Sequence, residues 1–479
     1  MTHALPPYPA YNDSGVAWLG QVPKHWEVHT FRQIARAVKG SQPQRLYLEH
    51  EAPAEAKPYL TMEYLRAPQG NPKFYCVPSN NDVVANAGDI LLLWDGANAG
   101  EFLVAKEGVV SSTAALLHFA HHNTRYIYFA LKQCEPLLRA FSTGMGIPHV
   151  DSRTLRHMPI PLPPLDEQVA IVRFLDFVDG RMRRYARAQQ QTIRLLTEYK
   201  QALIHHAVTG KVNVCTGAPY PTYKDSGIEW LGQVPIHWEV RRLKQVARVN
   251  PCKSEMPLAL RNGQSVFLPM ERVGTDGRYD TSDIRPISEL WNGYTYFRRG
   301  DILVAKITPC FENGKGAWLE NLPTEIGFGS TEFHVLRAQE QITAPYLYRI
   351  TTLSEFRRLG TDTMTGAAGQ QRVPEEFVAN FPIPLPPLAE QGAIVEYLDA
   401  QTARIDAAIA AIRRTVALLG EYRERLVADV VTGKVDVRAV AAGLPEADAG
   451  AADALRTPFA PDDAPTLEEA LQDATDGHE

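Results

Sequence analysis

The groupings of residues that come closest to catalytic motifs are a repeated Gly-Lys pair, two pairs of adjacent histidines and one Pro-Asp-Asp segment. The Gly-Lys pair lies in VTGKV, at 208–212 and again at 431–435. Neither copy has the upstream glycine or the following Ser/Thr of a phosphate-binding loop, and each follows a predicted helix instead of preceding one. Adjacent side chains point in different directions on a regular element, which disfavours metal binding by His121–His122 or His205–His206.

The remaining motifs of common enzymes are absent from the sequence. PDDAP at 461–465 is not followed by the lysine of a nuclease centre, no G-x-G-x-x-G follows a predicted strand, and no H-E-x-x-H occurs. There is also no Asn-Pro-Pro-aromatic tetrapeptide of the kind that holds a flipped base. We therefore expect no catalytic, cofactor-binding or metal-binding residues in this chain.

The sequence is instead dominated by an internal duplication. YPAYNDSGVAWLGQVPKHWEV at 8–28 recurs as YPTYKDSGIEWLGQVPIHWEV at 220–240, with 16 of 21 positions identical. MPIPLPPLDEQ at 158–168 recurs as FPIPLPPLAEQ at 381–391, with nine of 11 identical. The segments between these motifs, 29–157 and 241–380, have little in common. Because the period is far too long for a solenoid, each half is a domain followed by a helix.

A long helix is predicted after each proline-rich motif. Prolines cannot lie inside a helix, so each helix begins after them and ends near Gly210 or Gly433, which suit a left-handed C-terminal cap. A heptad-like apolar stripe predicts that the two helices form a coiled coil about 60 Å long. Its predicted interface residues are Leu175, Val178, Met182, Leu196, Tyr199, Leu203, Leu398, Ile405, Ile412, Leu419, Tyr422 and Leu426. The alternative is that each helix packs separately on its own domain.

The two variable segments predict one mixed α/β fold. GDILLLWDG at 88–96 and GDILVAKIT at 300–308 have the pattern of a turn leading into a buried strand. The segments 125–143 and 345–363 have helical apolar spacing. The predicted fold class is thus α+β, with two α/β domains joined by two long helices and related by an internal pseudo-twofold duplication.

Composition is that of a globular protein from a reducing compartment. Of 479 residues, 45% are hydrophobic and 22% charged, and no run of about 18 apolar residues suggests a membrane span. The N-terminus lacks the pattern of a signal peptide. The five cysteines include no C-x-x-C pair, which argues against a disulfide framework or a zinc site. We expect a cytoplasmic protein.

The net charge of −6 does not suit a nucleic-acid binder until its distribution is considered. Residues 436–479 carry eleven acidic and two basic groups, so the rest of the chain carries 47 basic and 44 acidic groups. The tail is rich in Ala, Asp, Glu and Pro, and its composition predicts disorder without a specific role.

Together these motifs resemble the specificity subunit of type I restriction–modification enzymes. The resemblance rests on YKDSGIEWLGQVPIHWEVRRL, PIPLPPLAEQ, the long helix and the duplication of the whole, and it covers nearly all of 8–437. It implies two target recognition domains, each reading one half of a split double-stranded DNA target. It also implies that the two helices form an antiparallel coiled coil that spaces these domains. It implies two modification (methyltransferase) subunits and ATP-dependent restriction subunits as partners. S-adenosylmethionine, ATP and magnesium would belong to those partners.

The resemblance predicts the domain order. Residues 1–165 form the first target recognition domain, 166–212 the central helix, 213–388 the second recognition domain, 389–437 the C-terminal helix and 438–479 the acidic tail. Two half-sites read from one face of B-DNA lie about 34 Å apart, which a rod of this length can span.

Candidate DNA-binding residues lie in polar loops of the variable segments. In the second segment, Lys306 and Lys315 suit phosphates, Thr308 and Asn313 suit base edges, and Gln370, Gln371 and Arg372 suit adenine or guanine in the major groove. In the first segment, the matching loops at 95–102 and 143–153 offer Asn98, His149, Ser152 and Arg153. A solvated loop is an equally good interpretation of each single residue. The repeated Trp18, Trp26, Trp230 and Trp238 are expected to fill a core or a protein interface.

Two other functions compete with this interpretation. One is a coiled-coil scaffold that binds only proteins, under which the loops at 305–318 and 365–374 would be dispensable. The other is a self-contained restriction or modification enzyme, for which the sequence offers no catalytic centre.

Overall fold

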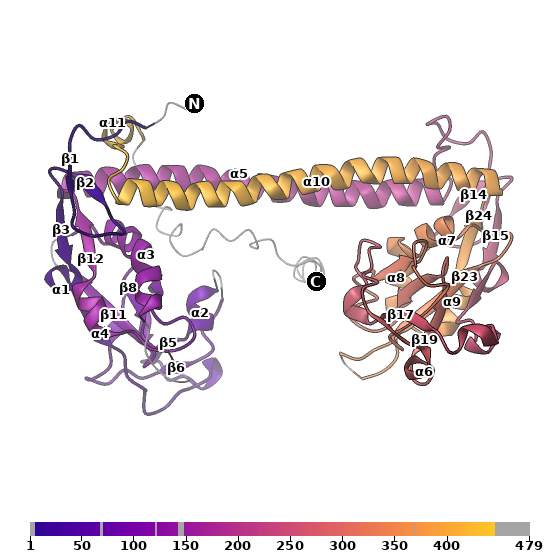
Figure 1. The fold of residues 1–479 in the computed structure, drawn as a ribbon, viewed down its shortest axis with the longest axis horizontal. Coiled ribbons are helices and arrows are strands. Elements are labelled where there is room, and N and C mark those ends of the chain that lie inside the picture. Colours follow the sequence, from indigo (N-terminus) through magenta and orange to yellow (C-terminus); the bar gives the residue numbers. More distant parts are fainter. Residues whose placement is uncertain (1–4, 68–69, 120–121, 142–147, 368, 446–479) are drawn as a thin grey trace. The chain divides into compact units, whose positions relative to one another are not determined.

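The computed structural model describes residues 5–67, 70–119, 122–141, 148–367 and 369–445 (Figure 1). The acidic segment from 446 onward and the first residues of the 143–153 loop lie outside them. The chain divides into two compact units, one comprising residues up to Gln190 and those from Arg413, the other comprising Gln191–Ile412. Each long helix therefore contributes one half to each unit.

The first unit contains two four-stranded sheets and two short strand pairs. The orders are β4-β11-β8-β9 and β6-β5-β10-β7, beside the pairs β1-β2 and β12-β3. Its strands are β1 (Tyr11–Asp13), β2 (Gln21–Pro23), β3 (Glu27–Thr30), β4 (Ala35–Lys39), β5 (Lys57–Leu60), β6 (Tyr75–Cys76), β7 (Val84–Ala85), β8 (Ile90–Leu93), β9 (Phe102–Val104), β10 (Gly108–Val110), β11 (Ala114–Phe119) and β12 (Pro159–Leu162). Its short helices are α1 (Phe31–Ile34), α2 (Met62–Arg66), α3 (Thr124–Ala140), α4 (Ser152–His157) and α11 (Arg438–Ala442).

The second unit repeats this topology strand for strand. Its sheets are β16-β23-β20-β21 and β18-β17-β22-β19, beside the pairs β13-β14 and β15-β24. Its strands are β13 (Tyr223–Asp225), β14 (Gln233–Pro235), β15 (Glu239–Arg242), β16 (Ala247–Val249), β17 (Gln264–Leu268), β18 (Ile284–Pro286), β19 (Thr295–Arg298), β20 (Ile302–Ala305), β21 (Gly316–Trp318), β22 (Ile326–Gly329), β23 (Phe333–Ala338) and β24 (Pro382–Leu385). Its short helices are α6 (Ile287–Leu290), α7 (Ala344–Thr351), α8 (Ser354–Thr361) and α9 (Glu375–Asn380). The predicted mixed α/β fold and its duplication are confirmed.

The two long helices are α5 (Leu165–Val208) and α10 (Leu388–Val431), each of 44 residues. Both begin directly after the prolines, as predicted, and Gly210 and Gly433 adopt the left-handed conformation just beyond their ends, with φ of 71° and 74°. Within each unit the two helices lie side by side and run antiparallel (Figure 1). Arg423 pairs with Asp179 at 2.7 Å in the first unit, and Lys200 pairs with Asp406 at 2.7 Å in the second.

The end of each long helix is part of a domain core. In the first unit Leu426, Val427 and Val430 at the end of α10 are buried in one core with α3 and the start of α5. In the second unit Ile204 and Val208 at the end of α5 are buried with Ile394 and Leu398 of α10. The helix that follows the first repeat, α5, thus ends in the core of the second unit, and the helix that follows the second repeat, α10, ends in the core of the first. Each domain core is completed by the helix of the other repeat.

The repeated motifs bind one another through a carboxylate. Glu167, which is 3% exposed, accepts hydrogen bonds from the Tyr8 hydroxyl and, at 3.0 Å, from the Trp26 indole, and lies 2.7 Å from His25. In the second unit Glu390 has the same partners at the equivalent positions: the Tyr220 hydroxyl at 3.1 Å, the Trp238 indole at 2.8 Å and His237 at 2.7 Å. Burial beside these carboxylates raises the pKa of both tyrosines, so both hydroxyls remain donors. The opening motif is thus repeated because it binds the start of each long helix.

The helix-packing stripe departs from the predicted heptads. Buried or half-buried apolar positions recur every eleven residues, at Ile171, Met182, Ile193 and Ile204 in α5 and at Ile394, Ile405, Val416 and Val427 in α10. Eleven residues are three turns of 3.67, so this stripe drifts by about 20° per repeat on a straight helix, in the opposite sense to the drift of a heptad stripe.

This drift corrects two predicted interface residues, Tyr199 and Tyr422, which are 58% and 57% exposed. Among the other ten, Leu175, Met182, Leu398, Ile405 and Leu426 are buried, while Val178, Leu196, Leu203, Ile412 and Leu419 are half-buried.

The predicted disorder of the tail is wrong for its first residues. Arg438–Ala442 form α11, and Val437 and Ala441 are buried in the core of the first unit. Among the repeated tryptophans, Trp26 and Trp238 are buried as expected, whereas Trp18 is 37% exposed. In the described part of the chain no helix is long and apolar enough to cross a membrane, and no group of three or more His, Cys, Asp or Glu residues could hold a metal ion.

The hydrogen bonds to Glu167 and Glu390 predict that removing either carboxylate lowers the stability of the protein, and that the two losses differ. Glu167→Ala leaves two buried donors without an acceptor, which should lower the free energy of unfolding by about 3 kcal/mol. Glu390→Ala should cost less, because the Glu390 side chain is 31% exposed and water can replace it. Urea unfolding measures both, with the exposed Glu424→Ala on α10 as the control. An equal, small loss in all three variants would contradict this role.

Candidate nucleic-acid interface

In the second unit the two predicted loops run antiparallel beside each other and are joined by backbone hydrogen bonds, a contact that we call the loop crossing. The segment after β20 meets the segment before α9 where Val373 N donates to Lys306 O at 2.8 Å and Thr308 N donates to Gln371 O at 2.9 Å. The Thr308 hydroxyl also accepts from Gln371 N at 3.1 Å. Residues separated by more than 60 positions in the sequence are thereby held at one place.

Most of the predicted side chains at this crossing are accessible. Gln370 is exposed, and Lys306, Thr308, Gln371 and Arg372 are half-buried. Arg372 forms a bidentate ion pair with Glu332, which precedes β23: Nη2 lies 2.8 Å from Oε1 and Nε lies 2.9 Å from Oε2. This hydrogen-bonded pair lowers the pKa of Glu332, so the carboxylate stays charged.

Lys315 and Asn313 lie farther along the loop and are half-buried. The ammonium group of Lys315 donates to the backbone oxygen of Met270 at 3.3 Å, so part of its hydrogen-bonding capacity is used within the protein. Asn313 N donates to Pro309 O at 3.0 Å, which turns the chain back toward β21. An ammonium group has three N–H donors, so Lys315 can contact a phosphate while it keeps its bond to Met270.

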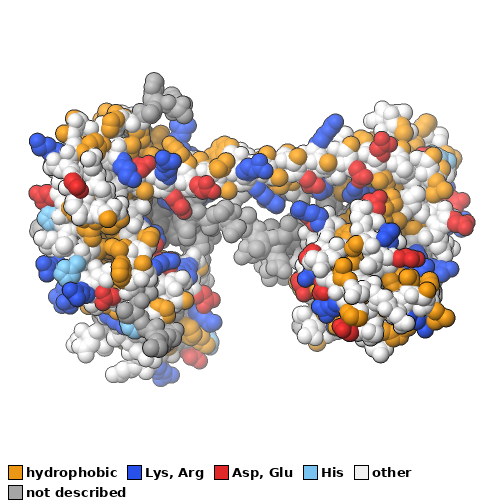
Figure 2. Space-filling view, in the orientation of Figure 1, with side chains coloured by type: hydrophobic (Ala, Val, Ile, Leu, Met, Phe, Trp, Pro, Cys, Tyr) orange, Lys and Arg blue, Asp and Glu red, His pale blue; other side chains and the backbone are white. Residues whose placement is uncertain are grey.

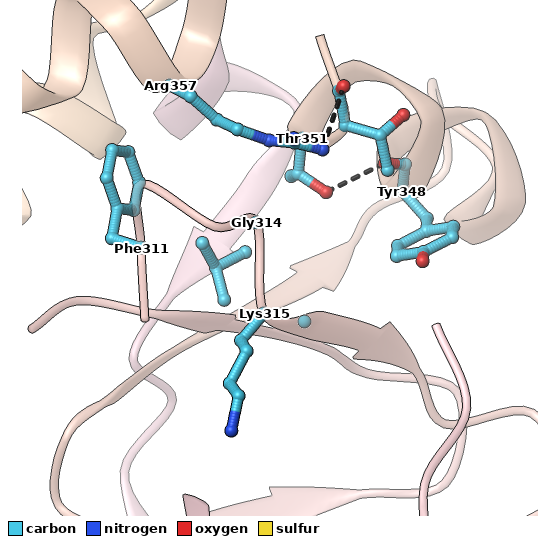
Figure 3. Close-up of a pocket in the computed structure, with 9 residues that line it drawn as sticks. Phe311, Gly314, Lys315, Tyr348, Thr351 and Arg357 are labelled. Carbon is cyan, nitrogen blue, oxygen red and sulfur yellow. Dashed lines mark hydrogen bonds between the residues drawn. The ribbon is translucent and has the colours of Figure 1, made fainter. Parts of the chain in front are cut away.

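An arginine, Arg357, packs against this loop at Gly314 (Figure 3). Gly314 has a φ of 71°, and a Cβ on it would lie 2.4 Å from Cζ of Arg357, so any other residue there would have a strained backbone and would displace the guanidinium. Arg357 donates to Thr352 O at 3.2 Å, and burial lowers its pKa. The adjoining cavity, lined by Phe311, Tyr348 and Thr351 among others, has room for about one water molecule.

The first unit has the same crossing with different side chains. Val150 N donates to Trp94 O at 2.9 Å, and Asp95 forms a β-bridge with His149. Asp95 pairs with Lys39 at 2.7 Å. His149 is exposed, and Asn98 is half-buried, with its backbone oxygen accepting from Glu101 N at 3.2 Å.

Ser152 and Arg153 are exposed on the first turn of α4, which Asp151 caps by accepting from Thr154 N at 2.7 Å. The crossing therefore brings together His149, Ser152 and Arg153 on one segment and places Asn98 on the facing loop.

The sequence did not reveal Glu332, Asp95 or Lys39 as parts of the crossings. Glu332 lies 40 positions from its partner Arg372, at a turn with no motif, and Lys39 lies 56 positions from Asp95. Aligning the two halves after placing their strands would have paired the loops, but not their ion-pair partners. On the face that Figure 2 shows, Lys and Arg lie among Asp and Glu over both units, which fits the near-neutral charge of residues 1–435.

Comparisons with known proteins agree with this architecture. A family model described as "Type I restriction modification DNA specificity domain" matches residues 23–193 and 235–413. The type I restriction enzyme MjaVIII specificity subunit of Methanocaldococcus jannaschii is 28% identical over 424 residues, which cover 87% of this chain and 95% of that protein. The type I restriction enzyme EcoAI specificity subunit of Escherichia coli is 40% identical over 166 residues, which cover 34% of this chain and 28% of that protein.

Among solved structures, a chain from "Structural basis underlying complex assembly and conformational transition of the type I R-M system" has the same fold. It aligns with a TM-score of 0.63 at 17% identity, covering 86% of this chain and 99% of that one.

The packing of Gly314 on Arg357 predicts a steric sensitivity in the loop. Gly314→Ala should destabilise the second unit by more than the roughly 1–2 kcal/mol that an alanine costs in the left-handed conformation, because its Cβ also displaces the guanidinium. Gly300→Ala is the matched control, since Gly300 has a φ of 88° with open space around its Cβ position. Equal decreases in the unfolding temperature of the two variants would show that the contact between Gly314 and Arg357 adds nothing to the cost.

Proposed function

The chain belongs to the family of type I restriction modification DNA specificity domains, and on that premise we propose that its two unlike loop crossings read the two halves of a split, asymmetric DNA target. The family is non-catalytic, and the chain is a DNA sequence-specificity subunit with two target recognition domains. One observation carries the proposal. The two opening motifs make equivalent contacts to Glu167 and Glu390, yet the loop crossings of the two domains carry different side chains.

The proposed domains follow the duplication. Residues 1–165 and 213–388 are the two recognition domains, 166–212 and 389–437 the two helical segments, and 438–479 the acidic tail. Lys306, Thr308, Asn313, Lys315, Gln370, Gln371 and Arg372 contact one half-site, and Asn98, His149, Ser152 and Arg153 contact the other. Near-neutral charge outside the tail supports weak DNA binding by this chain alone, because phosphate contacts dominate affinity.

The helix pair sets the gap between the half-sites in this proposal. A 44-residue helix is about 66 Å long, which exceeds one turn of B-DNA. The eleven-residue packing repeat supports a helix pair with a gentle right-handed supercoil, since 3.67 residues per turn slightly exceeds the 3.6 of a straight helix.

Partner binding is supported by a pair of equivalent apolar patches. Leu195 and Tyr199 on α5 are 53% and 58% exposed, and Leu418 and Tyr422, 223 positions later on α10, are 56% and 57% exposed. The helix pair does not bury these side chains, yet both halves retain them. We infer that they contact two copies of one partner, the methyltransferase subunit. S-adenosylmethionine then belongs to that subunit, and ATP and magnesium to the restriction subunits.

The proposal predicts half-site-specific effects of loop changes. The chain is expressed with its methyltransferase partner, and adenine methylation is mapped across a host genome by long-read sequencing. The wild type should give a split, asymmetric motif with a fixed gap. Scrambling residues 306–315 should alter or abolish recognition of one half-site, while scrambling 95–101 should affect the other. Unchanged methylation by both variants would favour the protein-only scaffold.

If the length of the helix pair sets the gap between the half-sites, an insertion into both helices should change that gap. Inserting eleven residues after Gln190 and eleven after Ile412 preserves the packing face and lengthens the helices by about 16 Å. The methylated motif should keep both half-sites with a gap longer by about five base pairs, or methylation should be lost. The control is a nine-residue insertion, which rotates the packing face by about half a turn and should destabilise the pair. An unchanged gap after the eleven-residue insertion would show that the length of the helix pair does not set the gap.

A further inference from the structure

The ion pair between Arg372 and Glu332 has features that a simple phosphate contact does not need. The backbone of Arg372 is fixed on both sides, since it exchanges hydrogen bonds of 2.9 and 3.1 Å with Thr365 and forms a bridge with Ile307. Its side chain is still 43% exposed. The guanidinium is therefore held at a defined place while remaining accessible to a ligand.

A count of hydrogen bonds shows which donors remain. A guanidinium has five N–H groups. Nε and Nη2 donate to Glu332, and Nη1 donates to Gln370 O at 3.0 Å. Within the described residues this leaves one N–H on Nη1 and one on Nη2. Two such donors match O6 and N7 of guanine in the major groove.

The carboxylate also discriminates between kinds of ligand. Glu332 neutralises the guanidinium and is itself 23% exposed, so the pair attracts a phosphate only weakly. Both of its oxygens accept from Arg372, so they are engaged before any base arrives. A neutral base edge with two acceptors fits this arrangement better than an anion does.

The first unit lacks the pair at the equivalent place. Lys306 N donates to Glu332 O at 2.9 Å, and Trp94 N donates to Thr113 O at 2.7 Å, so Thr113 occupies the position of Glu332. The corresponding bridges place His149 at the position of Arg372. A carboxylate-held arginine is thus specific to the second crossing.

Resting on the proposed function, we propose that Glu332 is a positioning residue that holds Arg372 as the guanine-reading group of the second recognition domain. The half-site read by this domain then contains a G·C pair whose identity depends on Arg372. The first domain reads the corresponding position by other contacts.

The test is methylation mapping and binding by the complete complex with its methyltransferase, comparing the wild type with Arg372→Gln, Arg372→Lys and Glu332→Gln. Both Arg372 variants should lose selectivity at one G·C position by about 10- to 100-fold, with the other half-site unchanged. Arg372→Lys should lose this selectivity because a lysine ammonium lacks the planar pair of donors that a guanidinium presents to a base. Glu332→Gln should reduce selectivity at that same position without weakening binding to non-specific DNA. The control is the exposed ion pair Arg358–Asp362, whose Arg358→Gln variant should leave the motif unchanged.

Three results would overturn the inference. Retained selectivity in Arg372→Lys, with a uniform loss of affinity across all sequences in Arg372→Gln and a salt dependence reduced by about one ion, identifies a phosphate contact. A wild-type half-site without any G·C pair sensitive to Arg372 rejects the guanine assignment while leaving the proposed function intact. A wild-type complex that methylates no split motif rejects both.

Discussion

A carboxylate at the start of each long helix holds this protein together. Glu167 and Glu390 each join the tyrosine, histidine and tryptophan of an opening motif to a helix that begins after the proline-rich segment. Removing such a group would leave buried donors unpaired, which costs more than the hydrogen bonds themselves contribute. Because both halves depend on the same contact, the motifs that form it are alike in the two repeats, whereas the variable segments between them differ.

The closure of each domain by the other repeat's helix follows from this frame. Gly433, after α10, packs against Pro23 and Trp26 of the first opening motif, and Gly210, after α5, packs against Pro235 and Trp238 of the second. In both places a Cβ would lie under 3 Å from the proline ring, so the glycine is needed for close approach as well as for its positive φ. The VTGKV segments, whose Gly-Lys pair lacks the context of a phosphate-binding loop, are therefore structural.

Much of this could be predicted from sequence because duplication doubles every signal. Helix starts after prolines, glycine caps and the strands at 90–93 and 302–305 followed from local chemistry. The packing stripe did not: a heptad and an eleven-residue repeat coincide over the first turns, and only the structure shows that Tyr199 faces solvent. The partners at the loop crossings were also hidden, because Glu332 and Lys39 are distant in sequence and belong to no motif.

If one repeated frame carries two different readers, replacing one variable segment by the other should make the two half-sites alike. Residues 29–157 are replaced by 241–380, so that both frames carry the same variable segment, and adenine methylation by the resulting complex is mapped. The methylated target should carry the second domain's half-sequence on both sides of the gap. Retention of the original asymmetric motif by a folded complex would show that the variable segments do not determine the sequence that is read.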